Sequence, residues 1–192
     1  MLEDLFQALD WPYFFLSALL FMIGIYAGPH AAEKEITLLL KYPRWMLRLM
    51  LRYFKPGYPI PVIFLLIFLL NNLSLFSSFV SGFLVIFPPL AAFLTGFNVA
   101  VIMFEMMGWR GIWQILVNPV AWLEFPASWI SFSLGFRLAE TQLARFHLPE
   151  TLVLFRELWP VYLKYVGGLL LLAAALETLL IVITRRFPEN GE

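Results

Sequence analysis

The chain has 192 residues, of which 61% are hydrophobic, 18% aromatic and only 14% charged. This composition is typical of an integral membrane protein. The net charge is zero, so no basic field indicates a nucleic-acid partner. The absence of cysteine excludes disulfides, thiolate metal sites and cysteine nucleophiles.

Five hydrophobic segments are long enough to cross the hydrocarbon core, which requires about 20 helical residues. They lie near residues 12–28, 60–81, 88–107, 119–140 and 160–184. We therefore predict an all-α integral membrane protein with one transmembrane domain over residues 1–192. The leader before the first segment carries Glu3, Asp4 and Asp10 where an export signal carries Lys or Arg, so we interpret this segment as a retained helix.

Basic residues collect on one side of the predicted spans. Nine of the 13 lie in the first connection, in the loop after the third span or at the C-terminus: Lys34, Lys41, Arg44, Arg48, Arg52, Lys55, Arg110, Arg185 and Arg186. The acidic leader and the loop 141–159 lie on the other side. Because basic loops remain in the cytoplasm, we predict a cell-membrane protein with its N-terminus outside and its C-terminus in the cytoplasm.

The connection between the first two spans, residues 32–55, is too charged to cross the bilayer and is rich in apolar residues. Its basic residues recur at intervals of three and four and form one stripe on a helix: Lys41, Arg44, Arg48, Arg52 and Lys55. We predict an amphipathic helix in the membrane interface whose stripe contacts anionic lipid head groups. The alternative is a juxtamembrane extension without lipid preference. Pro43 indicates a bend between two shorter helices.

The spans also carry polar and small residues at helical spacing. The third span has a row of small residues at Ala92, Gly96 and Ala100. Packing and hydrogen bonds between helices would explain single serines or glycines, but carboxylates in a membrane are costly and are explained less well. The predicted intramembrane polar cluster is Asn71, Asn72, Asn98, Glu124, Ser128 and Ser131, with Glu105, Arg137 and Glu177 as possible additions.

Glu124 lies between two prolines in the fourth span. If Asn118 caps the helix and Pro119 takes its first position, Glu124 lies about one and a half turns inside. Pro126 cannot donate a hydrogen bond to the carbonyl of Trp122, so an acceptor is left close to the carboxylate. Such a group attracts a proton, a cation or amide donors. We predict that amides of the second and third spans bind it: Asn71, Asn72 or Asn98.

Residues 60–140 resemble the stage II sporulation protein M family of bacterial and archaeal membrane proteins. The resemblance rests on Asn71 and Asn72, on Gly82, Pro88 and Asn98, and above all on residues 118–139. Family members carry P-H-G-x-x-E-x-P-A there, followed by a helix rich in alanine and glycine that ends in G-x-R. The matching residues are Pro119, Glu124, Pro126, Ala127, Gly135 and Arg137, whereas Val120 and Ala121 replace the His and Gly.

The founding member of the family is a membrane component of a peptidoglycan-degrading assembly, where it holds partner proteins in place and performs no chemistry itself. Most relatives occur in organisms that do not form spores, so the sporulation role does not transfer intact. The missing histidine puts in doubt any mechanism that needs an imidazole beside Glu124.

The residues themselves favour a protein that is not an enzyme and needs no metal or cofactor. His30 and His147 lie on opposite sides in the predicted topology, and neither Gly167–Gly168 nor the GWRG turn at 108–111 has the pattern of a phosphate-binding loop. The first hypothesis is an oligomeric scaffold that organises lipids or an unidentified membrane or envelope protein. The alternative is an ion- or proton-conducting transporter or channel that uses Glu124 and the asparagines. The absence of an internal repeat favours the scaffold.

Overall fold

The computed structural model describes residues 9–53, 58–145 and 148–186, and these form helices and turns with no strand. The all-α prediction is therefore confirmed for them. The elements are α2 (Trp11–Glu33), α3 (Thr37–Tyr53), α4 (Ile60–Val80), the 3-10 helix η1 (Ser81–Leu84), α5 (Phe87–Met107), α6 (Trp109–Val117), α7 (Ala121–Arg145), α8 (Leu148–Val161), the π-helix η2 (Tyr162–Gly167) and α9 (Gly168–Arg186).

Four helical segments among the described residues are long and apolar enough to cross a membrane: Trp11–Glu33, Ile60–Leu84, Phe87–Met107 and Leu148–Arg185. The predicted fourth span, 119–140, corresponds to α7, which is not one of the four. α7 is less apolar because it carries Glu124, Arg137 and several serines. The four candidate spans correspond to the other four predicted segments, and the count of five stays a prediction.

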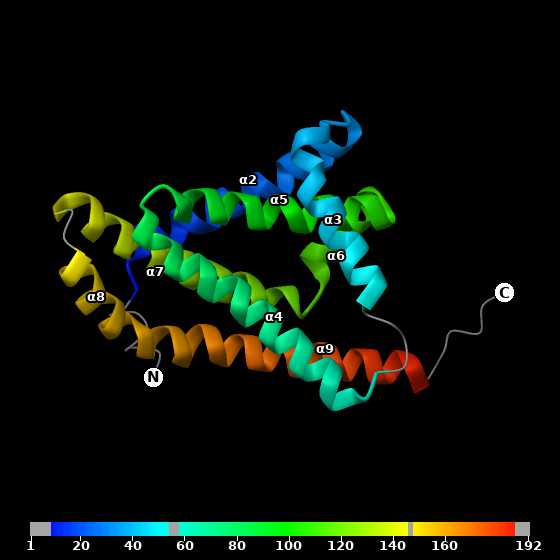
Figure 1. Cartoon of the computed structure of the whole chain (residues 1–192). Helices are drawn as coiled ribbons and strands as arrows, with labels where there is room; N and C mark the ends of the chain where they lie inside the picture. Colours follow the sequence, from blue (N-terminus) through cyan, green and yellow to red (C-terminus); the bar gives the residue numbers. More distant parts are fainter. Residues whose placement is uncertain (1–8, 54–57, 146–147, 187–192) are drawn as a thin grey trace.

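α7 occupies the centre of the bundle. It contacts α2 and α5 on one side and α4 and α9 on the other, and residues 130–136 are all buried. Figure 1 shows α7 between the α2–α5 pair and the α4–α9 pair. A helix enclosed by other helices exposes little surface to lipid, so it can carry polar groups that a peripheral span cannot.

The C-terminal helical segment is longer than the predicted span 160–184. Helix continues from α8 through η2 into α9, so residues 148–159, predicted as part of a loop, are helical. The charges that suggested a loop, at Arg156 and Glu157, lie on the exposed face, whereas Leu158 is buried. The segment Leu148–Arg185 has 38 residues. Its length of about 57 Å exceeds a hydrocarbon core of about 30 Å, so it extends beyond the core.

α3 is one continuous helix, so the predicted division at Pro43 into two shorter helices is wrong. A proline removes one backbone hydrogen bond, and the packing of the first half of α3 offsets this loss. Leu40 is fully buried against Phe97 and Val101 of α5. From Trp45 onward most side chains are exposed, and this half of α3 extends along one end of the bundle (Figure 1).

The GWRG turn is shorter than predicted. Gly108 makes the turn with φ +60°, a conformation that favours glycine, and α6 begins at the next residue. α6 packs against α5 so closely that a Cβ on Gly111 would meet the carbonyl oxygen of Met103. This short amphipathic helix buries Ile115 and exposes Trp113.

α2 and α5 approach each other through small residues. A Cβ on Gly24 would meet the carbonyl oxygen of Phe93, and a Cβ on Gly96 would meet that of Phe21. The predicted row of small residues on the third span thus lies at a helix contact, with both of its alanines fully buried. Its counterpart on α2, the pair Gly24 and Gly28, was missed by the sequence analysis. The G-x-x-x-G spacing is the signal that indicates it.

Candidate functional site

Glu124 contacts the second predicted span, as expected. The amide Nδ2 of Asn71 on α4 donates a hydrogen bond to Oε1 of Glu124 at 2.6 Å, in a half-buried position. The predicted contact between Glu124 and an asparagine is therefore confirmed for Asn71.

The helix that carries Glu124 begins later than predicted. Asn118 Oδ1 accepts a hydrogen bond from the backbone N–H of Val120 at 3.0 Å, and α7 starts at Ala121. Pro119 is therefore not the first helical residue, and Glu124 lies in the first turn of α7. A negative charge in the first turn is stabilised by the helix dipole, typically by about 0.3–1 kcal/mol.

Asn72 does not join Glu124. Its Oδ1 and its carbonyl oxygen share the single O–H donor of Tyr162, at 3.0 and 3.1 Å from the hydroxyl oxygen. Tyr162 belongs to η2 and is fully buried. Consecutive helical residues point about 100° apart, so Asn71 faces α7 while Asn72 faces the C-terminal segment.

Of the two predicted serines of α7, Ser131 bonds to a neighbouring helix and Ser128 bonds within α7. The hydroxyl of Ser131 is buried and donates to the carbonyl oxygen of Leu75 on α4 at 2.7 Å, whereas Ser128 donates to the carbonyl of Glu124 within its own helix at 2.8 Å. One turn beyond Ser131, Gly135 lies against η1, where a Cβ on Gly82 would meet its carbonyl oxygen. α4, η1 and α7 are therefore joined along most of their contact.

The other predicted members lie apart from this cluster. Within the described residues, Asn98 is half-buried on α5 and makes no hydrogen bond to Glu124. Glu105 accepts hydrogen bonds from Nε and Nη2 of Arg44 on α3, at 3.0 and 2.7 Å. Arg137 lies 13 residues after Glu124, about 20 Å further along α7. The structure therefore brings together only part of the predicted set.

Arg44, assigned to the lipid surface by the sequence analysis, has protein partners. Its guanidinium also donates to both carboxylate oxygens of Glu35, at 3.2 and 3.3 Å. The hydrogen bonds to Glu35 and to Glu105 raise the pKa of Arg44. These bonds tie the first half of α3 to the bundle. The other described members of the stripe, Lys41, Arg48 and Arg52, have exposed side chains, while Lys55 lies outside the described residues, as does His147.

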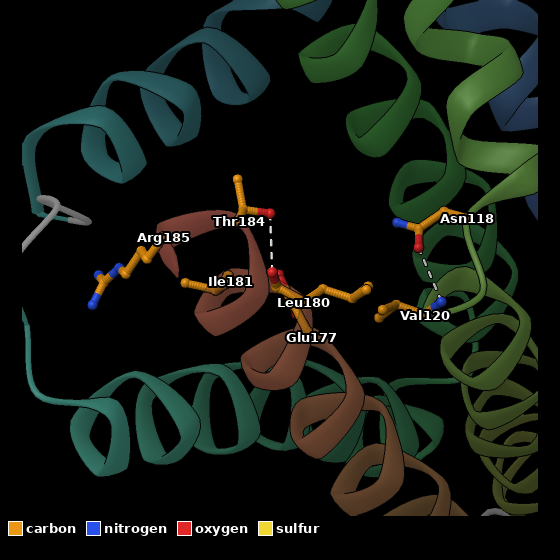
Figure 2. A pocket seen from close by; sticks show the side chains of 7 residues that line it. All are labelled: Asn118, Val120, Glu177, Leu180, Ile181, Thr184 and Arg185. Atoms are coloured by element: carbon orange, nitrogen blue, oxygen red, sulfur yellow. Dashed lines mark hydrogen bonds between the residues drawn. The ribbon is translucent and has the colours of Figure 1, made fainter. Parts of the chain in front are cut away.

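Glu177 of α9 lies close enough to Glu124 for the two charges to interact. It lines a cavity of about 330 Å³, together with Asn118, Val120, Leu180, Ile181, Thr184 and Arg185. Figure 2 shows Asn118 and Val120 on one side of this cavity and the α9 side chains on the other. Val120, which stands where the family motif has His, is therefore part of the cavity wall. The sequence analysis named only Glu177 of these seven as a site residue.

The cavity lies at the end of the bundle that holds most of the predicted cytoplasmic basic residues. Arg185 donates to the carbonyl of Tyr58, just before α4, at 3.2 Å, and the indole of Trp109 donates to Glu33 at 3.0 Å. These contacts place the starts of α4 and α6 and the ends of α2 and α9 at this end (Figure 1).

Long apolar helices that enclose a central helix with polar contacts define a helical membrane protein. A family model described as Stage II sporulation protein M matches residues 17–180. The chain belongs to this family, and the match extends well beyond residues 60–140, from α2 into α9. No curated protein and no solved structure matches the chain.

Proposed function

We propose that this protein is a non-enzymatic, multi-pass scaffold of the cell membrane, whose cytoplasmic end holds lipids and partner proteins in place. The observation that supports it is the use of the interior polar groups. Ser131 bonds to the backbone of α4, Asn71 bonds to Glu124, and Tyr162 bonds to Asn72. Groups committed to neighbouring helices fix the register of a bundle and favour a static role.

The surface proposed to bind lipids and partner proteins is the half of α3 that follows Arg44, the residue that pairs with the bundle. Its exposed apolar side chains include Trp45, with 49% of its surface accessible, and Leu51, with 65%. Lys41, Arg48 and Arg52 are exposed beside them. A helix with these two kinds of side chain suits an anionic membrane surface, on which the apolar residues enter the lipid and the basic residues meet the head groups.

The lipid contact is tested with the full chain in nanodiscs. The chain has no natural cysteine, so a single cysteine at Leu49 can carry an environment-sensitive dye. Dye emission should shift to the blue when the bilayer contains anionic lipid, and high salt or the combined change K41E/R48E/R52E should remove the shift. The change R156E, at the opposite end of the bundle, is the control. Emission that is indifferent to lipid charge would favour a juxtamembrane extension without lipid preference.

The scaffold role itself is tested by crosslinking in intact cells. A photoreactive residue at Trp45 should give a discrete protein adduct, whereas the same residue at Leu69, which is exposed in the middle of α4, should not. A second copy of this chain in the adduct would identify a homo-oligomer. If neither position forms a protein adduct, the scaffold proposal is wrong.

Ion or proton transport is the second candidate. The observation that favours it is the cavity that reaches Glu177, which lies close to Glu124. Intramembrane carboxylates often mark such paths. Proton and potassium flux into proteoliposomes decides between the two candidates. Flux that E124Q abolishes, with thermal stability unchanged, would replace the scaffold proposal by transport.

A further inference from the structure

The cavity beside Glu177 carries charges of opposite sign at its two ends. Glu177, Ile181, Thr184 and Arg185 follow one another at helical spacing, so they share a face of α9. Asn118 and Val120 form the facing wall (Figure 2). Most of the remaining lining is apolar, as in sites that bind small amphiphilic molecules.

The inner end of the cavity has an acceptor without a donor. Within the described residues, no hydrogen bond reaches the carboxylate of Glu177, which is only partly exposed. The neighbouring Glu124, in contrast, accepts a hydrogen bond from the amide of Asn71. A carboxylate removed from water requires a donor or a cation. A primary ammonium group supplies both, since it carries a positive charge and three N–H donors.

The outer end of the cavity has a donor with spare capacity. The side chain of Arg185 lies in the last turn of α9 and is exposed, and one of its N–H groups donates to the carbonyl of Tyr58. A guanidinium has five N–H donors and binds phosphate well. Eight residues separate Arg185 from Glu177, which corresponds to about 12 Å along the helix. Two ionic contacts of up to about 4 Å each leave room between them for a short link.

From these observations we propose that the cavity binds the head group of an aminophospholipid, with its ammonium group at Glu177 and its phosphate at Arg185. The two-carbon link of phosphoethanolamine suits the space between the two contacts. This site differs from the surface of α3, which would meet anionic lipid, and it does not rest on the scaffold proposal.

The surroundings of the cavity favour a lipid over a soluble compound with the same head group. Leu180 lines the cavity and is itself 39% exposed, and Leu179 and Ile183 beside it are also exposed. In a membrane, exposed apolar side chains of a spanning helix face acyl chains. The tails of a phospholipid are attached through its phosphate, so with the head group in the cavity they leave beside Arg185 and turn back into the bilayer along the exposed side chains of α9.

The test measures lipid retention by the full chain after purification in detergent and addition of defined lipids, with native mass spectrometry as the readout. Phosphatidylethanolamine should bind about tenfold more tightly than phosphatidylcholine, whose trimethylated nitrogen has no N–H donor. E177Q should reduce this ratio to about one. R185Q should weaken the binding of both lipids. E157Q, an exposed glutamate of α8, is the matched control and should keep the tenfold ratio.

Equal binding of the two lipids by the unaltered chain, or an unchanged ratio in E177Q, would overturn the proposal. Free phosphoethanolamine is a separate arm: if it displaces the lipid at equal concentration, the site takes a soluble compound and the lipid assignment is wrong. If E177Q does not fold, E177D replaces it. This variant keeps the carboxylate and should retain a preference for phosphatidylethanolamine, and loss of all preference would contradict the ionic contact.

Discussion

Replacement of Glu124 by leucine should destabilise the bundle by leaving the amide of Asn71 without its acceptor. The structure shows one hydrogen bond of 2.6 Å between them, in a half-buried position between α4 and α7. An orphaned buried donor costs about 1–3 kcal/mol. Hydrogen bonds between membrane helices contribute less, about 0.6 kcal/mol on average and up to about 1.7, because the unfolded helices also find partners in the membrane. We therefore expect E124L to cost about 1–2 kcal/mol, from the loss of this hydrogen bond together with the charge in the first turn of α7.

Glutamine at the same position should have a smaller effect. Its carbonyl oxygen can still accept the hydrogen bond from Asn71, and the loss is limited to the charge in the first turn of α7, about 0.3–1 kcal/mol. The measurement is reversible unfolding in mixed micelles, followed by helicity. A double-mutant cycle that combines E124L with N71L isolates the pair, and we expect a coupling free energy of about 1 kcal/mol.

The order of the two variants is the critical result. If E124L unfolds at the same denaturant concentration as the unaltered chain, the carboxylate is not buried between the helices and the geometry is wrong. If E124L is destabilised and the cycle gives no coupling to N71L, Glu124 has another partner. The result expected for a structural role is a large loss in E124L, a small one in E124Q and no ion flux in either.

Three further predictions concern packing, topology and α3. G24A should lower stability by about 1–3 kcal/mol because its Cβ would meet the backbone of α5. G168A, whose Cβ would meet no atom within 4 Å beyond the nearby backbone of its own helix, should be neutral in the same unfolding assay, and equal effects of the two changes would contradict the close contact. A cysteine placed at Gln7 should react with an impermeant reagent added outside the cell, whereas one placed at Asn190 should react only when the reagent has access to the inside. Equal accessibility of the two positions would exclude an odd number of spans. E105Q should leave the melting temperature nearly unchanged while raising hydrogen exchange in α3. A loss of stability as large as that of G24A would show that the whole bundle depends on the ion pair between Arg44 and Glu105.

Sequence reasoning located the helices and one contact of the site. The predicted segments near 60–81 and 88–107 overlap α4 and α5 closely, because continuous apolar runs of this length have one stable form in a membrane. The pairing of Glu124 with Asn71 followed from the cost of an unpaired carboxylate. The choice between Asn71 and Asn72 could not be made, since it depends on how α4 is rotated against α7.

Features that depend on the relation between two helices were not accessible from the sequence. The cavity beside Glu177 combines the end of α9 with the loop before α7, and no pattern within either segment indicates the other. Arg44 was assigned to the lipid surface by its spacing, but its partner Glu105 lies 61 residues away. In contrast, the spacing of Gly24 and Gly28 indicates a close helix contact from the sequence alone.

Because α7 lies at the centre of the bundle, its low hydropathy does not by itself indicate a functional site. A helix enclosed by its neighbours has little contact with lipid, so it does not need an apolar surface. Polar residues on such a helix are therefore not by themselves evidence of a function. Ser131 and Glu124 then meet groups that the fold already supplies, the carbonyl of Leu75 and the amide of Asn71. Glu177 lies close enough to Glu124 to interact with it but has no donor among the described residues. A polar group that the fold does not satisfy is a stronger indication of a ligand than one that it does, so the search for a binding partner begins at Glu177 rather than at Glu124.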